Sequence, residues 1–377
     1  MPGFELINKK DELREIKKIF NSGGVLFRQG FENRRNKSYK VNEFENKFKK
    51  KFNTKFALAV SSGTAALRVA LASLNIKKND EVITQSFTFV ATAEAIIESG
   101  AKPIFTEINQ TLNMCPSDLK KKITKKTKAV IVVHMLGVPA NLEEIKKICK
   151  IKKIFLIEDT AWGCGAKYKN NFLGTNGDIG TFSFDFAKTI TTGEGGMCVF
   201  KIKKHYLAAK AWHDHGHENN PKVPRWEDTR MSSGFNFRMT ELQGAVGIAQ
   251  LKKINYIISK QRENYFKIRK IILKSSKTKE REIPKKSFIS ADAFIFFLEN
   301  NNQAKLFRKL LLKEGISTKI LPEACTWHFS KYWEHMKIKS SGLENSEKIL
   351  KKCVSLPIFV KSKNNFFKSL ERVIKKI

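Results

Sequence analysis

Apolar and polar residues alternate along the first half of the chain in blocks that predict strands followed by helices. The stretch "LAVSSGTAALRVALASL" predicts a short strand, a turn at 61–64 and then a helix with apolar residues at helical spacing. The runs "KAVIVVH" and "KIFLIED" are short and continuously apolar, which is typical of parallel strands buried on both faces. The helix-patterned "NLEEIKKICK" lies between them. This order predicts a mostly parallel sheet covered by helices.

The pattern changes after Met239, where helical spacing continues over a long span. An apolar strand, "ADAFIFFL", follows this span, and a helix at 303–314 and a closing basic helix come after it. We therefore predict an α/β protein with a large domain at 1–250 and a smaller α+β domain at 251–377.

Composition excludes several classes of function. The net charge of +35 suggests nucleic-acid binding, but the lysines lie mostly on predicted helix faces and accompany abundant Asn and Ile, which indicates a coding bias. No nucleic-acid-binding motif occurs, so we expect no nucleic-acid partner. No apolar run is long enough to cross a bilayer, and we expect no membrane contact. The six scattered cysteines form no C-x-x-C pair, which favours reduced thiols in a cytoplasmic protein and no metal site.

Three groups that could bind or react with a ligand follow predicted strands. Parallel sheets bind their ligands at the carboxyl ends of their strands. The turn 61–64 begins a helix, so it either caps that helix or binds a phosphate through its N–H groups and hydroxyls. Asp159 ends a strand, where it caps the next turn or pairs with a protonated heterocyclic nitrogen. Lys188, in "FSFDFAKTITTGEGG", is either a surface lysine or a nucleophile with a lowered pKa.

Together these three groups are the parts needed to hold pyridoxal 5′-phosphate. The cofactor requires a phosphate anchor, an acidic partner for its ring nitrogen and an amine for its aldehyde. The motifs of competing sites are absent from the sequence: it contains no G-x-G-x-x-G, no Gly-Lys pair, no G-x-S-x-G and no H-E-x-x-H.

Six stretches then occur in a familiar order: "SSGTAAL", "DEVITQSFTFVATAEAI", "VHMLGVPANLEEI", "IEDTAWGCGA", "GDIGTFSFDFAKTITTGEGGM" and "GFNFRMTELQGAVGIAQL". In them the chain resembles the DegT/DnrJ/EryC1/StrS family of sugar aminotransferases. The resemblance extends to about residue 260 and continues more weakly through "VSLPIF". It implies the aspartate-aminotransferase fold, which is fold type I of the pyridoxal phosphate enzymes.

The resemblance also implies roles for single residues. Lys188 matches the Schiff-base lysine, and Asp159 matches the partner of the pyridine nitrogen. The remaining cofactor-binding matches are Gly63 and Thr64 at the phosphate turn, Ser183 as a further phosphate ligand, Phe89 as the stacking ring, and Asn236, which in the family reaches the phosphate of the neighbouring subunit. The last match implies a homodimer with shared active sites.

One cofactor position departs from the family pattern. The family usually has Asp-Ala-Ala-Gln or Asp-Ala-Ala-His, whereas this chain has Asp159-Thr160-Ala161-Trp162. An indole N–H can donate a hydrogen bond but cannot accept one, so the partner of the cofactor's ring hydroxyl is in question at Trp162. Family members that are sugar dehydratases replace the lysine by histidine, so Lys188 favours transamination.

The substrate side is less patterned. The stretches "HDHGHENN" and "WHFSKYWEHM" are similar to family members that make 8-amino-3,8-dideoxy-manno-octulosonate, a lipopolysaccharide sugar. His215 and His217 are candidate substrate contacts, with a polar loop as the alternative. We expect an amino group to move from glutamate to a keto sugar. A pyridoxal-phosphate-dependent sugar dehydratase and a non-catalytic cofactor-binding sensor are the alternatives.

Overall fold

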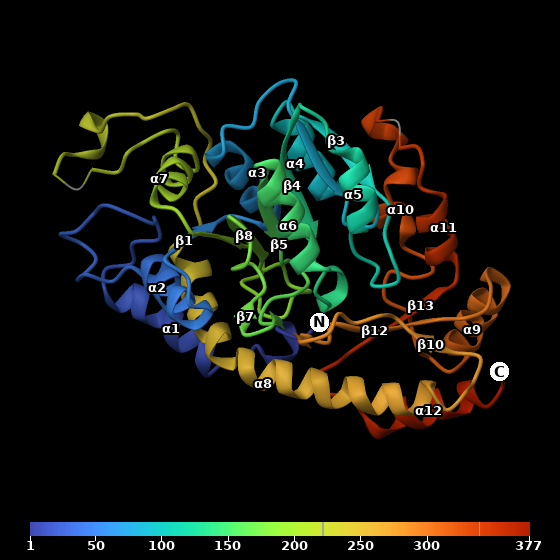
Figure 1. Cartoon of the computed structure of the whole chain (residues 1–377). Helices are drawn as coiled ribbons and strands as arrows, with labels where there is room; N and C mark the ends of the chain where they lie inside the picture. The colour runs from blue at the N-terminus through green and yellow to red at the C-terminus, as the bar shows by residue number, and fades with distance from the viewer. Residues whose placement is uncertain (221, 339) are drawn as a thin grey trace.

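The computed structural model describes residues 1–220, 222–338 and 340–377, and its main feature is a seven-stranded sheet (Figure 1). The strands, in order across the sheet, are β1 (Phe56–Val60), β9 (Gly196–Phe200), β8 (Ile179–Ser183), β5 (Phe155–Asp159), β4 (Thr127–Val133), β2 (Glu81–Gln85) and β3 (Lys102–Thr106). Strand β9 is antiparallel to both of its neighbours, and all other pairs are parallel. The predicted α/β class with a mostly parallel sheet is confirmed.

Helices cover both faces of this sheet, which explains why nearly all residues of its strands are buried or half-buried. The covering helices are α1 (Asp11–Asn21), α2 (Lys40–Phe52), α3 (Gly63–Ser73), α4 (Ala91–Glu98), α5 (Pro116–Lys122), α6 (Leu142–Lys152) and α7 (Lys203–Trp212). Along β4, Ile131 and Val133 pack in the cluster that contains α3 and α4. Val130 and Val132 point the other way, into the cluster that contains α5 and α6.

The C-terminal third is built on a smaller antiparallel sheet. Its strands, in order, are β10 (Lys279–Glu280), β12 (Ala293–Phe297) and β13 (Cys353–Pro357). Its helices are α9 (Asn301–Lys313), α10 (Cys325–His328), α11 (Glu344–Lys351) and α12 (Asn364–Ile374). A third sheet of two-residue strands links this part to the segment that follows β5, and its strands are β11 (Ser287–Phe288), β6 (Lys167–Tyr168) and β7 (Asn171–Phe172). Short 3-10 turns lie at Phe4–Leu6, Met135–Gly137, Arg225–Glu227, Ser330–Tyr332 and Glu334–Met336.

One long helix, α8 (Glu241–Ile272), runs beneath both parts of the molecule (Figure 1). It starts with a capping box in which Thr240 and Gln243 bond each other's backbone N–H groups. Ile248 and Leu251 pack in a core cluster with α2, whereas Tyr265 and Ile268 pack with the smaller sheet. The predicted domain boundary at residue 250 falls inside this helix, so the division at that residue stays a prediction.

Two further observations concern the chain within the described ranges. No helix there is long and apolar enough to span a membrane. All six cysteines are free thiols, and no group of three or more His, Cys, Asp or Glu side chains among these residues is arranged to hold a metal ion.

Candidate active site

Lys188 lies in the loop that joins β8 to β9. Its N–H donates to the Asp185 carbonyl at 3.0 Å, and its own carbonyl accepts from the Gly3 N–H at 3.1 Å. Further along the loop, the Thr191 hydroxyl accepts from the N–H of Gly193 at 2.9 Å. Gly193 has φ +83°, a left-handed conformation that glycine adopts without steric cost. The backbone around the lysine is therefore held on several sides.

The Lys188 side chain rests on an aromatic ring instead of a carboxylate. Its Nζ lies 3.4 Å from the centroid of the Trp162 ring, and no ion pair within the described ranges includes it. Burial lowers the pKa of Lys188 to about 8; nearby Asp292 and Asp185 oppose this shift and Lys319 adds to it. At pH 7 roughly one tenth of this amine is therefore unprotonated, far more than for an ordinary lysine, and the unprotonated form is the one that a nucleophile or a general base requires.

Asp159, the last residue of β5, is a buried carboxylate with few partners. Oδ1 accepts from the Ala161 N–H at 3.1 Å, and Oδ2 accepts from the Thr92 hydroxyl at 3.3 Å. Burial raises the pKa of Asp159 above its ordinary value. A protonated nitrogen placed beside it would favour its charged form.

The first turn of α3 approaches the end of β8 so closely that a side chain cannot fit between them. A Cβ on Gly63 would stand 2.7 Å from Cβ and 3.0 Å from Oγ of Ser183. The Ser62 hydroxyl caps the helix by accepting from the Ala65 N–H at 3.0 Å. The other first-turn N–H groups have no intrahelical acceptor, and Thr64 is exposed beside them. Helix N–H groups and the Ser183 hydroxyl together form a cradle suited to a phosphate.

These groups fit pyridoxal 5′-phosphate. A comparison of Asp159 with Glu158, its neighbour in β5, supports this fit. Glu158 is also fully buried, but His134 Nε2 lies 3.0 Å from it and the Gly177 N–H donates to it at 2.6 Å. Despite its burial, these bonds hold the pKa of Glu158 below its ordinary value. The protein thus provides Glu158 with a ring nitrogen and several backbone donors, whereas Asp159 has one N–H, one hydroxyl and no ion-pair partner within the described ranges. A protonated ring nitrogen would supply the partner that Asp159 lacks.

Phe89, the predicted stacking ring, is 41% exposed and lies in an aromatic group with two residues of α10. Its ring centroid is 5.4 Å from that of His328 and 6.5 Å from that of Trp327. The N–H groups of Thr88 and Val90 donate to the carbonyls of His328 and Trp327. The C-terminal part therefore lies directly against the segment that carries Phe89.

Trp162, where the chain departs from the family pattern, is the centre of the constellation. Besides Lys188, its ring faces Lys319, whose Nζ is 5.3 Å from the centroid, and His328 at 6.3 Å. Its carbonyl accepts from the Ser290 hydroxyl at 3.3 Å. Burial lowers the pKa of His328 to about 4, and the charge of Lys188 adds to the effect. The indole thus joins the loop that carries Lys188 to the C-terminal part.

Three predicted site residues lie elsewhere, in the hairpin at 213–238. Asn236 is exposed and forms an isolated antiparallel bridge with Asp214. His215 is exposed, and His217 is buried with Nδ1 3.2 Å from Asp228 Oδ2. Within the described ranges, no hydrogen bond or ring contact links these three residues to Lys188. Their roles therefore stay predictions.

Sequence analysis missed four residues of the constellation: Thr92, Asp292, Lys319 and His328. Thr92 stands inside the stretch "DEVITQSFTFVATAEAI", but at a position to which the resemblance assigns no role, and Asp292 and Lys319 are single polar positions outside the six matching stretches. His328 lies within "WHFSKYWEHM", but its spacing gave no reason to select it. Asp292 and Lys319 are 27 positions apart and meet only because they flank β12 and β13.

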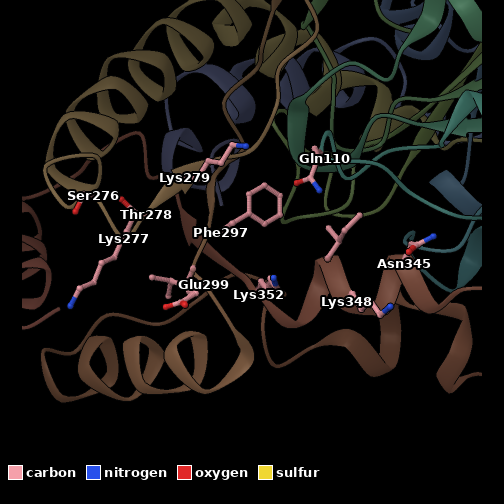
Figure 2. Close-up of a pocket in the computed structure, with 12 residues that line it drawn as sticks. Gln110, Ser276, Lys277, Thr278, Lys279, Phe297, Glu299, Asn345, Lys348 and Lys352 are labelled. Carbon is pink, nitrogen blue, oxygen red and sulfur yellow. The ribbon is translucent and has the colours of Figure 1, made fainter.

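A separate basic pocket does not include any of the predicted site residues. It has a volume of about 880 Å³ and lies between β10, β12 and α11. Figure 2 shows Lys277, Lys279, Lys348 and Lys352 around it, with Phe297 near its centre.

The chain is similar to known proteins over most of its length. The sequence model of the DegT/DnrJ/EryC1/StrS aminotransferase family matches residues 26–377. A GDP-perosamine synthase of Escherichia coli O157:H7 is 43% identical over 224 residues, which are 59% of this chain and 60% of that protein. The match thus spans about three fifths of that relative's length. The uncharacterized protein MJ1066 of Methanocaldococcus jannaschii is 33% identical over 355 residues, 90% of each chain.

Solved structures show the same fold. The aminotransferase TlmJ of Streptoalloteichus hindustanus superimposes with a TM-score of 0.87 at 21% identity, covering 98% of this chain and 96% of that one. The E. coli GDP-4-keto-6-deoxy-D-mannose-3-dehydratase, solved with bound hydrated PLP, has a TM-score of 0.85 at 26% identity, covering 97% and 96%. The predicted fold and pyridoxal 5′-phosphate as the cofactor are confirmed.

Proposed function

The chain belongs to the DegT/DnrJ/EryC1/StrS aminotransferase family, and from that premise we propose that it transfers an amino group from glutamate to a keto sugar. The observation that carries the proposal is the position of Lys188. Its amine has a lowered pKa, lies on the Trp162 ring and shares the strand-end region of the sheet with Asp159 and the Gly63–Ser183 cradle.

Each residue of the constellation has a defined task in this reaction. Pyridoxal 5′-phosphate, when bound, supplies a ring that accepts electrons from the substrate carbon. Gly63, Thr64 and Ser183 would hold its phosphate, and Phe89 offers an exposed ring face for stacking. Asp159 would pair with the protonated ring nitrogen.

Lys188 is then the proton carrier. Its Nζ would take the proton from the α-carbon of the donor and deliver it to the C4′ carbon of the cofactor, and it would move a proton the opposite way when the sugar is aminated. A pKa of about 8 suits both directions, because an acid–base group works best when its pKa is near the ambient pH. Trp162 and His328 surround this amine with ring surface, which keeps water away from it.

The finer assignments rest on resemblance. Sugar-nucleotide enzymes such as the GDP-perosamine synthases support a keto sugar for cell-surface polysaccharide, including lipopolysaccharide, as the acceptor. His215 and His217 are proposed to contact it. Asn236 is proposed to complete the neighbouring site of a homodimer, and exposed Trp226, Met231 and Phe235 in the same hairpin provide apolar surface for an interface.

The direct test is the donor half of the reaction. Cofactor-loaded protein mixed with glutamate alone should lose its visible absorption band and release one 2-oxoglutarate per site. Borohydride treatment before glutamate should fix the cofactor to the peptide that contains Lys188, and Lys188→Ala should abolish both results. An unchanged band with wild-type protein and glutamate would refute glutamate as the donor.

A dehydratase is the second candidate, because a solved dehydratase has the same fold at 26% identity. Supplying GDP-4-keto-6-deoxymannose separates the two activities. A transaminase incorporates labelled nitrogen from glutamate into the sugar, whereas a dehydratase removes a hydroxyl and leaves no label in the product. A sensor would give neither product.

A further inference from the structure

Two lysines from distant parts of the chain face one indole. Lys188 comes from the loop after β8, and Lys319 lies between α9 and α10, where its N–H donates to the Ser355 carbonyl at 2.8 Å. Their Nζ atoms lie 3.4 Å and 5.3 Å from the centroid of the Trp162 ring. Lys319 therefore belongs to the active-site constellation, although the proposed function gives it no task.

Asp292 holds the Lys319 ammonium in place and leaves part of it available. Nζ donates to Oδ2 at 2.6 Å and to the Asp292 carbonyl at 3.2 Å. Asp292 is buried, whereas the Lys319 side chain remains 19% exposed. An ammonium carries three N–H donors, and the third has no acceptor within the described ranges.

The backbone beside both partners is strained. Ala291, just before Asp292, has φ +60°, and Ile320, just after Lys319, has φ +72°. A left-handed conformation is costly for a residue with a Cβ, above all for a β-branched one, at about 1–3 kcal/mol. Such a conformation persists only where the surrounding structure holds it in place. Here it occurs directly beside both members of one ion pair.

The charges of the pair reach the catalytic amine. Asp292 raises and Lys319 lowers the pKa of Lys188, so both lie within its electrostatic range. A substrate group bound at Lys319 would stand beside the atom that reacts at Lys188. An ammonium with a free N–H, fixed geometry and an aromatic wall suits a carboxylate.

We propose that Lys319, positioned by Asp292, binds a carboxylate of the substrate that reacts at Lys188, and that this contact selects acidic substrates. The inference rests on the proposed transaminase function and deepens it. The carboxylate belongs either to the amino donor or to an acidic keto sugar, and the chemistry of recognition is the same for both.

The test measures binding without turnover. Cofactor-loaded protein is titrated by calorimetry with glutarate, which resembles the donor but has no amine, and with 3-deoxy-manno-octulosonate, an acidic sugar. Lys319→Gln removes the charge, Lys319→Met also retains the apolar stem, and Lys319→Arg keeps a cation. Lys267→Gln is the matched control, because it breaks the exposed Lys267–Glu263 pair of 2.7 Å on α8.

We expect Lys319→Gln and Lys319→Met to weaken the binding of one carboxylate about 10- to 100-fold, the loss expected for a hydrogen bond to a charged group. Lys319→Arg should retain most of the affinity, and Lys267→Gln all of it. Loss confined to glutarate assigns the carboxylate to the donor, and loss confined to the sugar acid assigns it to the acceptor.

Unchanged affinity for both ligands in the folded Lys319 variants would overturn the proposal, as would a wild-type protein that binds neither. A lower melting temperature with unchanged affinity would identify the pair as purely structural. Failure of the proposed function looks different: wild-type protein would bind carboxylates through Lys319 but release no 2-oxoglutarate from glutamate.

Discussion

Two neighbouring carboxylates, Glu158 and Asp159, show how single residues define this site. Both are buried at the end of β5, but the pKa of Glu158 is lowered and that of Asp159 is raised. The difference follows from their partners, because Glu158 has His134 and several backbone N–H groups, whereas Asp159 has one N–H and one hydroxyl. Burial without a charge partner is a cost that a structural residue would not carry.

Asp159→Asn should therefore preserve or raise the stability of the cofactor-free protein but weaken its binding of the cofactor. The cofactor-free variant should be as stable as the wild type or more stable by about 1 kcal/mol, because an amide avoids the burial of a charge but can still accept from Ala161. Urea unfolding measures this. The same variant should lose bound cofactor on dialysis. A variant that is destabilised yet retains cofactor would contradict the assigned role.

The lowered pKa of Lys188 predicts a pH-dependent reactivity. In cofactor-free protein, the rate at which pyridoxal 5′-phosphate attaches to Lys188 should rise through about pH 8, because the unprotonated amine is the nucleophile. The attachment is measured on the borohydride-fixed peptide by mass spectrometry. The same pKa shift makes stability depend on pH. Between about pH 8 and pH 10.5, Lys188 binds more protons in the unfolded chain than in the folded one, so the free energy of unfolding rises with pH over this range. A midpoint near 10.5 would disprove the shift.

Gly63→Ala tests the phosphate cradle. A methyl group 2.7 Å from Ser183 Cβ forces α3 and β8 apart, which should destabilise the protein by about 1–3 kcal/mol and weaken phosphate binding. Adding Ser183→Gly should restore most of the stability, because it removes the clashing atoms. Cofactor affinity should stay low in the double variant, since the hydroxyl is gone. Full recovery of affinity would exclude Ser183 as a phosphate ligand.

The sequence was informative about these residues to different degrees. Asp159 ends a clear apolar strand and Lys188 lies in the loop after another strand, so their positions could be predicted from pattern. Trp162 could be recognised as a departure, but its contact with Lys188 depends on how the turn after β5 folds across the sheet. Asp292 and Lys319 carry no pattern, because their meeting is a product of tertiary packing.

At the scale of elements, α8 organises the N-terminal helices as well as the two parts of the chain. Glu241 in its first turn is buried, and its carboxylate accepts from the N–H groups of Lys40 and Val41, which begin α2. One helix thus caps another. A Cβ on Gly244, one turn later, would lie 2.7 Å from the Val41 nitrogen, so the two helices cannot separate to admit a side chain without losing the cap.

Glu241→Ala should consequently destabilise the protein by about 2–4 kcal/mol, because two buried N–H donors lose their acceptor. Glu241→Gln should cost less, since one amide oxygen remains to accept. Thermal or urea unfolding gives both values. Glu263→Gln on the exposed face of α8 is the control and should change stability by less than about 0.5 kcal/mol. Equal effects of Ala and Gln would show that packing matters here and the cap does not.

Most elements were predictable because the spacing of their apolar residues and their length indicate the same type of element. Examples are β4, β5, β12 and α8. The insertion of antiparallel β9 between β1 and β8 was not predictable, because an apolar run does not encode its direction or its neighbours. The two-residue strands β6, β7 and β11 are too short to have a period. The boundary at residue 250 stays a prediction, because it falls inside the continuous helix α8.

At the scale of the whole molecule, the proposed dimer makes a prediction about mixed subunits. Lys188→Ala and Asn236→Ala chains should each be nearly inactive alone, but refolding them together should restore about a quarter of wild-type activity. Half of the random dimers are then hybrids, and each hybrid holds one site with both residues intact. No recovery in hybrids confirmed by mass spectrometry would place Asn236 outside a shared site. Sedimentation of the wild type gives the oligomeric state directly.

The pairing of β1 with β9 determines when the cofactor site can come into existence. Gly196 of β9 pairs with Val60, just before the turn at Gly63, and also with Ser183 of β8, so the two walls of the cradle meet only through a strand that comes later in the chain than both. Contacts so distant in sequence form late, because the intervening chain must be ordered first. A nascent chain on the ribosome therefore has no cradle until β9 has emerged. We expect cofactor loading to follow folding of the entire sheet, and ribosome-bound chains truncated before residue 196 to retain no pyridoxal 5′-phosphate.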